Sequence, residues 1–143
     1  MISITFGHII NRTDYSLVLS HFTFQKNAPA QQDHLIEIKP HESITLSKPI
    51  DLQLVYTMVG NRIFTIVSPK NPSLELIISI SWGQALFIDM KIENREKETT
   101  IELETVQKNV STHNNCCAVM NLIIAGTEFE ESALEIIEII PKK

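Results

Sequence analysis

The sequence predicts an all-β protein, a single-domain antiparallel β-sandwich that spans residues 1–143. A chain of 143 residues suits one compact domain, which buries roughly two thirds of the surface that the unfolded chain exposes. Apolar and polar residues alternate along most of the chain, as expected for strands with one buried face. No long segment shows the 3.6-residue period of an amphipathic helix. Roughly nine or ten strands separated by turn signals are typical of a sandwich.

The first strand is expected over residues 2–11, where the apolar side chains share one parity. These side chains are Ile2, Ile4, Phe6 and Ile10. The polar segment NRTDY, residues 11–15, then turns the chain into a second strand, which begins near Leu17. Its apolar parity switches at Phe22 and Phe24, and this switch predicts a β-bulge or a change of burial within the strand.

Prolines divide the next part of the chain. A polar loop is expected over residues 25–33. Two short strands follow at residues 36–38 and 44–46. Their boundaries are Pro40 and Pro49, because proline has no N–H to donate to a neighbouring strand.

Two hairpins are expected in the middle of the chain. Their paired strands are residues 52–58 with 63–67, and residues 74–82 with 86–92. The first hairpin turns at residues 59–62, where Gly-Asn suits a backbone that needs positive φ. The second turns at Gly83-Gln84.

The last third of the chain alternates strands with polar turns. The expected elements are a charged turn at 94–99, a strand from 101, a polar loop at 107–115, a strand at 116–124, an acidic turn at 127–132 and a strand at 133–140. The final segment is rich in isoleucine and precedes Pro141. Both features favour a strand over a helix, because β-branched side chains suit strands.

Charge and hydropathy exclude several classes of protein. The net charge is -5, with 12 basic and 17 acidic residues, and no basic cluster precedes Lys142. We therefore expect no nucleic-acid partner. The apolar run 76–90 breaks at Gly83, short of the roughly 20 residues that a membrane-spanning helix needs. The N-terminus lacks the pattern of a secretory leader, so we expect a protein that is cytoplasmic as synthesised.

The polar residues form no motif typical of catalysis or of a metal site. The nearest metal-like cluster is His113 with Cys116 and Cys117, which lacks a second pair of ligands at a usual spacing. We interpret it as a polar loop that enters a strand with two small, reduced cysteines. The other histidines are scattered singly. The sequence thus predicts no catalytic residues, no metal site and no cofactor, and so a protein that is not an enzyme.

Several segments, taken in order, resemble the aegerolysin family. The opening ITFGHIINRTDYSLVL is followed by FTFQK and by IEIKPHESITL, and the last is similar to a proline-containing segment of that family. IFTIVSP is similar to a family strand that ends in Asp/Ser-Pro, and ESALEIIEIIPKK to its closing strand. ISISWGQ resembles the segment in which the family places an exposed tryptophan. The resemblance covers nearly the whole chain.

The resemblance implies an aegerolysin/actinoporin-like sandwich that binds membrane lipids. Such proteins are small, acidic and synthesised without a leader. The resemblance therefore implies that this chain lies peripheral to membranes or is exported without a leader sequence. The lipid would be of the sphingolipid or sterol class. In several members the lipid-bound protein recruits a larger pore-forming partner with a membrane-attack-complex/perforin domain. The chain would then be the lipid-recognition component of a two-component cytolysin.

Aromatic residues near strand ends are the candidate lipid contacts, because tryptophan suits the boundary between water and lipid headgroups. The candidates are Trp82, Gln84, Phe87, Phe22 and Phe24. Trp82 also continues the apolar parity of Ile80, so the alternative is that it caps the core. A second hypothesis is a soluble protein-interaction module that has lost lipid binding, because Trp82 is the only tryptophan and glycines are few. Such a module would bind another protein or a second copy of itself. A carbohydrate-binding sandwich is the weakest alternative, because aromatic residues are few.

Overall fold

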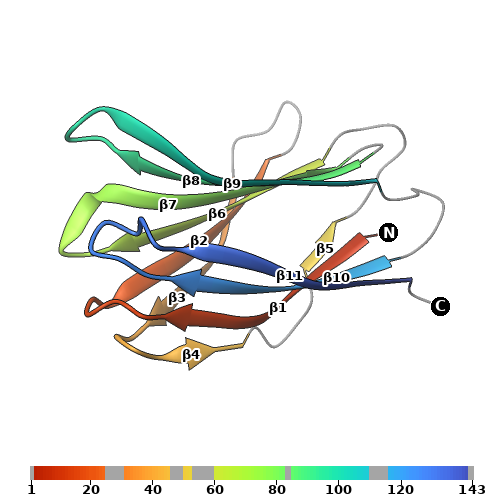
Figure 1. The fold of residues 1–143 in the computed structure, drawn as a ribbon, viewed down its shortest axis with the longest axis horizontal. Coiled ribbons are helices and arrows are strands. Elements are labelled where there is room, and N and C mark those ends of the chain that lie inside the picture. Colours follow the sequence, from red (N-terminus) through yellow and green to blue (C-terminus); the bar gives the residue numbers. More distant parts are fainter. Residues whose placement is uncertain are drawn as a thin grey trace.

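The computed structural model describes residues 2–24, 31–45, 50–52, 60–82, 85–109 and 116–141. Throughout these ranges the regular structure is β, and the strands form two sheets that lie face to face (Figure 1). The predicted all-β sandwich is confirmed at this level. The strands are β1 Ile2–Asn11, β2 Leu17–Phe24, β3 Gln31–Ile38, β4 Ser43–Ile44, β5 Ile50–Leu52, β6 Gly60–Ser68, β7 Asn71–Trp82, β8 Ala85–Asn94, β9 Thr99–Asn109, β10 Cys116–Ile124 and β11 Ala133–Pro141.

The larger sheet has six strands in the order β3-β2-β6-β7-β8-β9, and every neighbouring pair in it is antiparallel. The pairing of β2 with β3 shifts register between His21 and Phe22. The unpaired residue is Asp33 of β3, whereas β2 keeps one unbroken register with β6 from Val18 to Phe24. The β-bulge predicted within β2 from the switch of apolar parity is therefore wrong, and Phe22 and Phe24 occupy positions of the same face as Val18 and Ser20. A second shift occurs in the β8–β9 pair, between Met90 and Lys91.

The smaller sheet is mixed, and here the expectation of an antiparallel sandwich is wrong. β10 lies between β11 and β1, and it runs parallel to β1. β4 and β5 both pair antiparallel with the other edge of β1, at its opposite ends. A hairpin would force neighbours in sequence to run antiparallel, but β1 and β10 are far apart in the chain, so no turn constrains their direction.

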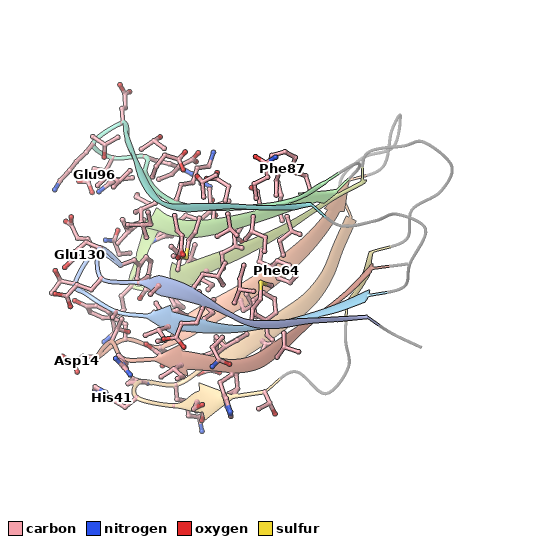
Figure 2. All side chains as sticks on the ribbon, turned by 45° about the vertical axis from the view of Figure 1, so that its right-hand side comes forward. Asp14, His41, Phe64, Phe87, Glu96 and Glu130 are labelled. Atoms are coloured by element: carbon pink, nitrogen blue, oxygen red, sulfur yellow. The ribbon has the colours of Figure 1, made fainter. Side chains whose placement is uncertain are left out.

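The core lies between the two sheets and consists mainly of Ile, Leu, Phe and Met. Phe6 of β1 and Phe64 of β6 meet across it edge to face, with ring centroids 5.2 Å apart and planes at 77°. Figure 2 shows Phe64 between the sheets. Burying a side chain of this size stabilises the fold by about 1.5 to 3 kcal/mol. Alternate residues of β7 reach this core, as their period of two predicts.

Some boundaries differ from those predicted. The expected hairpin turn at residues 59–62 is wrong from Gly60 onward, because Gly60 to Arg62 belong to β6 and pair with β7. The two expected loops are shorter than predicted, since β3 begins at Gln31 and β9 continues to Asn109. Polar sequence alone does not distinguish an edge strand from a loop. The expected strand at 52–58 beyond Leu52, the turn residue Val59, the end of the expected strand 44–46 at Leu46, and Gly83 and Gln84 lie outside the described residues.

One end of the sandwich is held by Asn11, the last residue of β1, which is fully buried. Its Nδ2 donates hydrogen bonds to the carbonyl oxygens of Tyr15 at 2.7 Å, Lys39 at 3.0 Å and Ile38 at 3.3 Å. Its Oδ1 accepts hydrogen bonds from the backbone N–H and the hydroxyl of Thr13, at 2.9 and 2.6 Å. A single amide thus ties the β1–β2 turn to the end of β3.

Candidate contact face

The side of the six-stranded sheet that faces away from the core is the candidate contact surface. Cross-strand register groups its positions into four rows, named here after their residue on β8. The Phe87 row is Phe24, Asn61, Ser81, Phe87 and Gln107, and the Asp89 row is Phe22, Ile63, Ser79, Asp89 and Thr105. The Lys91 row is Leu35, Ser20, Thr65, Ile77, Lys91 and Glu102, and the Glu93 row is Glu37, Val18, Val67, Glu75, Glu93 and Thr100. These four rows are called the outer face below.

Among the side chains of this face whose burial the structure describes, Phe87 is the large apolar one that is exposed, with 43% of its surface accessible. Figure 2 shows it on the outer side of the sheet, opposite to Phe64. Its cross-strand partners are Ser81 and Gln107. Ile101 is the other exposed large hydrophobic residue among those described, at 51% exposure. It lies on edge strand β9 and pairs with the buried Ile92 of β8.

The structure brings together some of the predicted lipid contacts and separates others. Phe24 and Phe87 occupy the same row, and Phe22 occupies the next one. Trp82 lies opposite Gly60 and Leu86, in a row that alternates with that of Phe87. For Phe22, Phe24 and Trp82 the strand position is what the structure describes. The prediction for Gln84 falls outside the described residues.

Charge is distributed unevenly over the outer face. β2, β6 and β7 contribute twelve of its positions, and only Glu75 among them is charged. The Glu75 side chain is 16% exposed, and its Oε2 lies 3.5 Å from Nη2 of Arg95. The remaining charges are Glu37 on β3 and Asp89, Lys91, Glu93 and Glu102 on the paired positions of β8 and β9.

Two carboxylates meet on the charged half of this face. A side-chain hydrogen bond to Asp89 raises the pKa of Glu102, desolvation and repulsion by the Asp89 charge raise it further, and Lys91 partly opposes them. The Thr105 hydroxyl donates a hydrogen bond to Asp89 Oδ1 at 3.1 Å. Lys91 Nζ lies 3.5 Å from Glu93 Oε1. The part of the outer face formed by β8 and β9 is therefore acidic and carries a single cation, Lys91.

Within the described ranges, no group of three or more His, Cys, Asp or Glu side chains is arranged to hold a metal ion. His41 Nε2 lies 2.8 Å from Asp14 Oδ1, but this exposed pair joins two turns at the opposite end of the sandwich from Phe87 (Figure 2). His113 lies outside the described residues, and Cys116 and Cys117 are described only as successive positions of β10.

Comparison with known proteins identifies no relative of this chain: no family model, no curated protein and no solved structure matches it. No helix within the described residues is long and apolar enough to cross a membrane.

Sequence reasoning missed the uncharged part of the outer face. Ile77 interrupts the alternation of its strand, yet it lies on the outer face and is only 8% exposed. Its neighbours in the Lys91 row include Thr65 and Ser20, which come from other strands. The signal was the lack of charge at alternate positions of three separate strands. These uncharged positions form one surface only because the register places the three strands side by side.

Proposed function

We propose that this protein is a non-enzymatic membrane-lipid-binding β-sandwich, whose contacts lie at the Phe87 end of the outer face. The observation that carries the proposal is the 43% exposure of Phe87 in the same row as Phe24. An exposed phenylalanine beside serine and glutamine resembles the mixed surfaces that enter the lipid headgroup region. The family resemblance of the sequence supports the same reading, and it extends the proposal to recruitment of a larger pore-forming protein.

The charge of the protein indicates the class of lipid. With a net charge of -5 and acidic groups on β8 and β9, the protein gains nothing from the negative potential of anionic membranes. Binding would therefore depend on apolar insertion and on hydrogen bonding to an uncharged or zwitterionic headgroup. Sphingolipids and sterols offer such groups.

Sedimentation with liposomes tests the proposal. We expect the protein to sediment with vesicles of phosphatidylcholine, sphingomyelin and cholesterol, and not with vesicles of phosphatidylcholine and phosphatidylserine. Phe87→Ser should weaken the affinity for these vesicles at least about tenfold, since losing one buried aromatic contact costs roughly 1.5 to 3 kcal/mol. Ile101→Ser is the matched control, because it removes the other large hydrophobic side chain that is exposed among the described residues. Equal loss in both variants, or no binding to any mixture, contradicts the proposal.

A protein-interaction module is the second candidate function, and the uncharged positions of β2, β6 and β7 favour it. A sheet face in water normally carries charged side chains, whereas contact surfaces are depleted of them. Co-purification with a defined partner, lost on placing a charge at Thr65, would support this candidate. Retention of the partner by that variant would oppose it.

A further inference from the structure

We propose that His21 of β2 and His34 of β3 bind one transition-metal ion of the Zn²⁺ class, which links edge strand β3 to its neighbour. The two residues are direct partners in the β2–β3 pairing. They stand apart in the sequence, which therefore predicts no metal site. For both of them the strand position is what the structure describes, so the site follows from their register. It depends neither on lipid binding nor on a protein partner.

Direct pairing gives the two histidines the separation that chelation needs. Side chains of directly opposite residues in an antiparallel pair share one face of the sheet, and their Cβ atoms lie roughly 4.5 to 5.5 Å apart. Two imidazole nitrogens bound to one tetrahedral Zn²⁺, each at about 2.0 to 2.1 Å, lie roughly 3.3 Å from each other. Rings that start from Cβ atoms at that separation can converge on one ion. The remaining coordination positions are open to water.

The β-bulge of the β2–β3 pair falls at the same place. His21 pairs with His34 and Phe22 pairs with Gln32, so Asp33 is left without a strand partner. Bulges change the direction of side chains and are over-represented next to active sites. This bulge also places a residue with a carboxylate beside the histidine pair, and a nearby negative charge favours a cation.

The row that holds the pair lies on the core-facing side of the sheet. His21 also pairs with Phe64 of β6, which is buried. An imidazole at a core-facing position needs partners for its ring nitrogens, because an unpaired polar atom is costly away from water. β2 and β3 are the last two strands at one edge of the six-stranded sheet, so the row reaches the rim of the core there. A single metal ion binds a nitrogen of each ring at once.

The charges around the pair suit a cation. The sequences of β2 and β3 contain Asp33 and Glu37 but no lysine or arginine. Arg62 of β6 pairs with Thr23, in the next row of the same face, and Asp33 supplies a negative charge against it. The net charge of the protein, -5, also favours the accumulation of divalent cations at its surface.

β3 is the strand that gains from a metal link. Among the described strands it pairs with β2 alone, and its first four residues, QQDH, are polar. Burial of apolar side chains therefore contributes little to holding this part of β3 in place. An ion that binds both strands only when they are paired stabilises the folded state by mass action.

Titration calorimetry of the untagged 143-residue chain with ZnCl₂ tests the site. We expect the wild type to bind one equivalent of Zn²⁺. His21→Gln and His34→Gln should each weaken binding at least about tenfold, because even loss of an outer-sphere partner of a metal ligand costs about 10- to 100-fold in affinity. His8→Gln and His41→Gln are the matched controls, since both histidines are exposed and belong to other segments. Circular dichroism establishes that each variant is folded, and either ligand variant alone decides the outcome.

Two further measurements distinguish chelation by this pair from binding elsewhere. The electron paramagnetic resonance of bound Cu²⁺ should show coupling to two imidazole nitrogens in the wild type and to one in each ligand variant. Replacing Cys116 and Cys117 together by serine should leave the Zn²⁺ affinity unchanged. A wild type that binds no Zn²⁺, a folded His34→Gln variant that binds as tightly as the wild type, or loss of binding in the cysteine variant overturns the proposal. Equal weakening in the His8→Gln control does the same, because it identifies an adventitious surface site.

Discussion

The carboxylate of Glu104 accepts a hydrogen bond from the backbone N–H of Leu134 at 3.1 Å, and this bond joins the edge strands of the two sheets. Glu104 pairs with Met90, whose side chain is fully buried, so it occupies a core-facing position of β9. An acidic side chain is acceptable there because it satisfies an edge N–H of β11 that no neighbouring strand would reach.

Replacing Glu104 should therefore destabilise the sandwich. We expect Glu104→Ala to lower the free energy of unfolding by about 1 to 2 kcal/mol, because it leaves the partly buried N–H of Leu134 without an acceptor. Glu104→Gln keeps a carbonyl acceptor and should lose less than half as much. Urea unfolding of the two variants measures the difference. Equal losses would mean that the carboxylate does not act through this hydrogen bond.

Asn11 should be among the polar residues least tolerant of change. Asn11→Ala removes a donor shared by three carbonyl groups and an acceptor for Thr13, all at a fully buried position. We expect a loss of about 3 to 4 kcal/mol in thermal or urea unfolding. Asn71→Ala, at an exposed asparagine, is the control and should stay within about 0.5 kcal/mol of wild type. If Asn11→Ala unfolds with nearly the wild-type free energy, the hydrogen bonds of the Asn11 amide contribute little to stability.

Glu130 should make the turn between β10 and β11 sensitive to acid. The backbone N–H of Glu130 itself and that of Glu128 donate to its carboxylate, and these bonds lower its pKa below the ordinary value of 4.5. Because the folded pKa is the lower one, the stabilisation is fully present above about pH 4.5 and is lost as the pH falls through the folded pKa. Below that range, wild type and Glu130→Ala should be equally stable.

The variant measures this contribution. At pH 7 we expect Glu130→Ala to be less stable by about 0.5 to 1 kcal/mol, a small value because the side chain is exposed. Glu131→Ala removes the same charge from the next residue and serves as the control. A gap between wild type and Glu130→Ala that persists at pH 2 would rule out the carboxylate as its source.

Trp82 offers a probe of lipid contact, because it is the only tryptophan and ends β7 one residue beyond Ser81, the partner of Phe87. We expect its fluorescence to shift to shorter wavelength when vesicles of phosphatidylcholine, sphingomyelin and cholesterol are added. Phe87→Ser should suppress the shift at the same lipid concentration. If the protein sediments with vesicles and the emission does not change, the contact lies away from this end of the sheet.

The strands were predictable where the pattern is local. The alternation around Ile78 predicts a half-buried strand because successive side chains point to opposite faces. The parity switch at Phe22 predicted a bulge or a change of burial in the second strand, and the unbroken register of β2 with β6 rules out the bulge there. The turn expected at Gly60 was wrong because Gly-Asn also occurs inside a strand that pairs along its whole length. The parallel pairing of β1 with β10 joins distant segments, and no local pattern specifies it.

The candidate contact face was also predictable only where the pattern is local. Phe87 was predictable as an exposed aromatic residue, since the alternation places it opposite to the buried Ile88. The surroundings of Thr65 were not, because they are assembled from four strands whose register the sequence does not state.

The locked side chain of Asn11 has a consequence for covalent modification. Asn11-Arg12-Thr13 matches the acceptor pattern for N-linked glycosylation, and Nδ2 of Asn11 is the atom to which a sugar would be attached. In the folded protein that nitrogen is buried and donates to carbonyl groups of two segments. Glycan addition and folding therefore compete for one atom. Expressed through a secretory route, chains that fold first should keep an unmodified mass, and chains modified first should be unable to close this end of the sandwich.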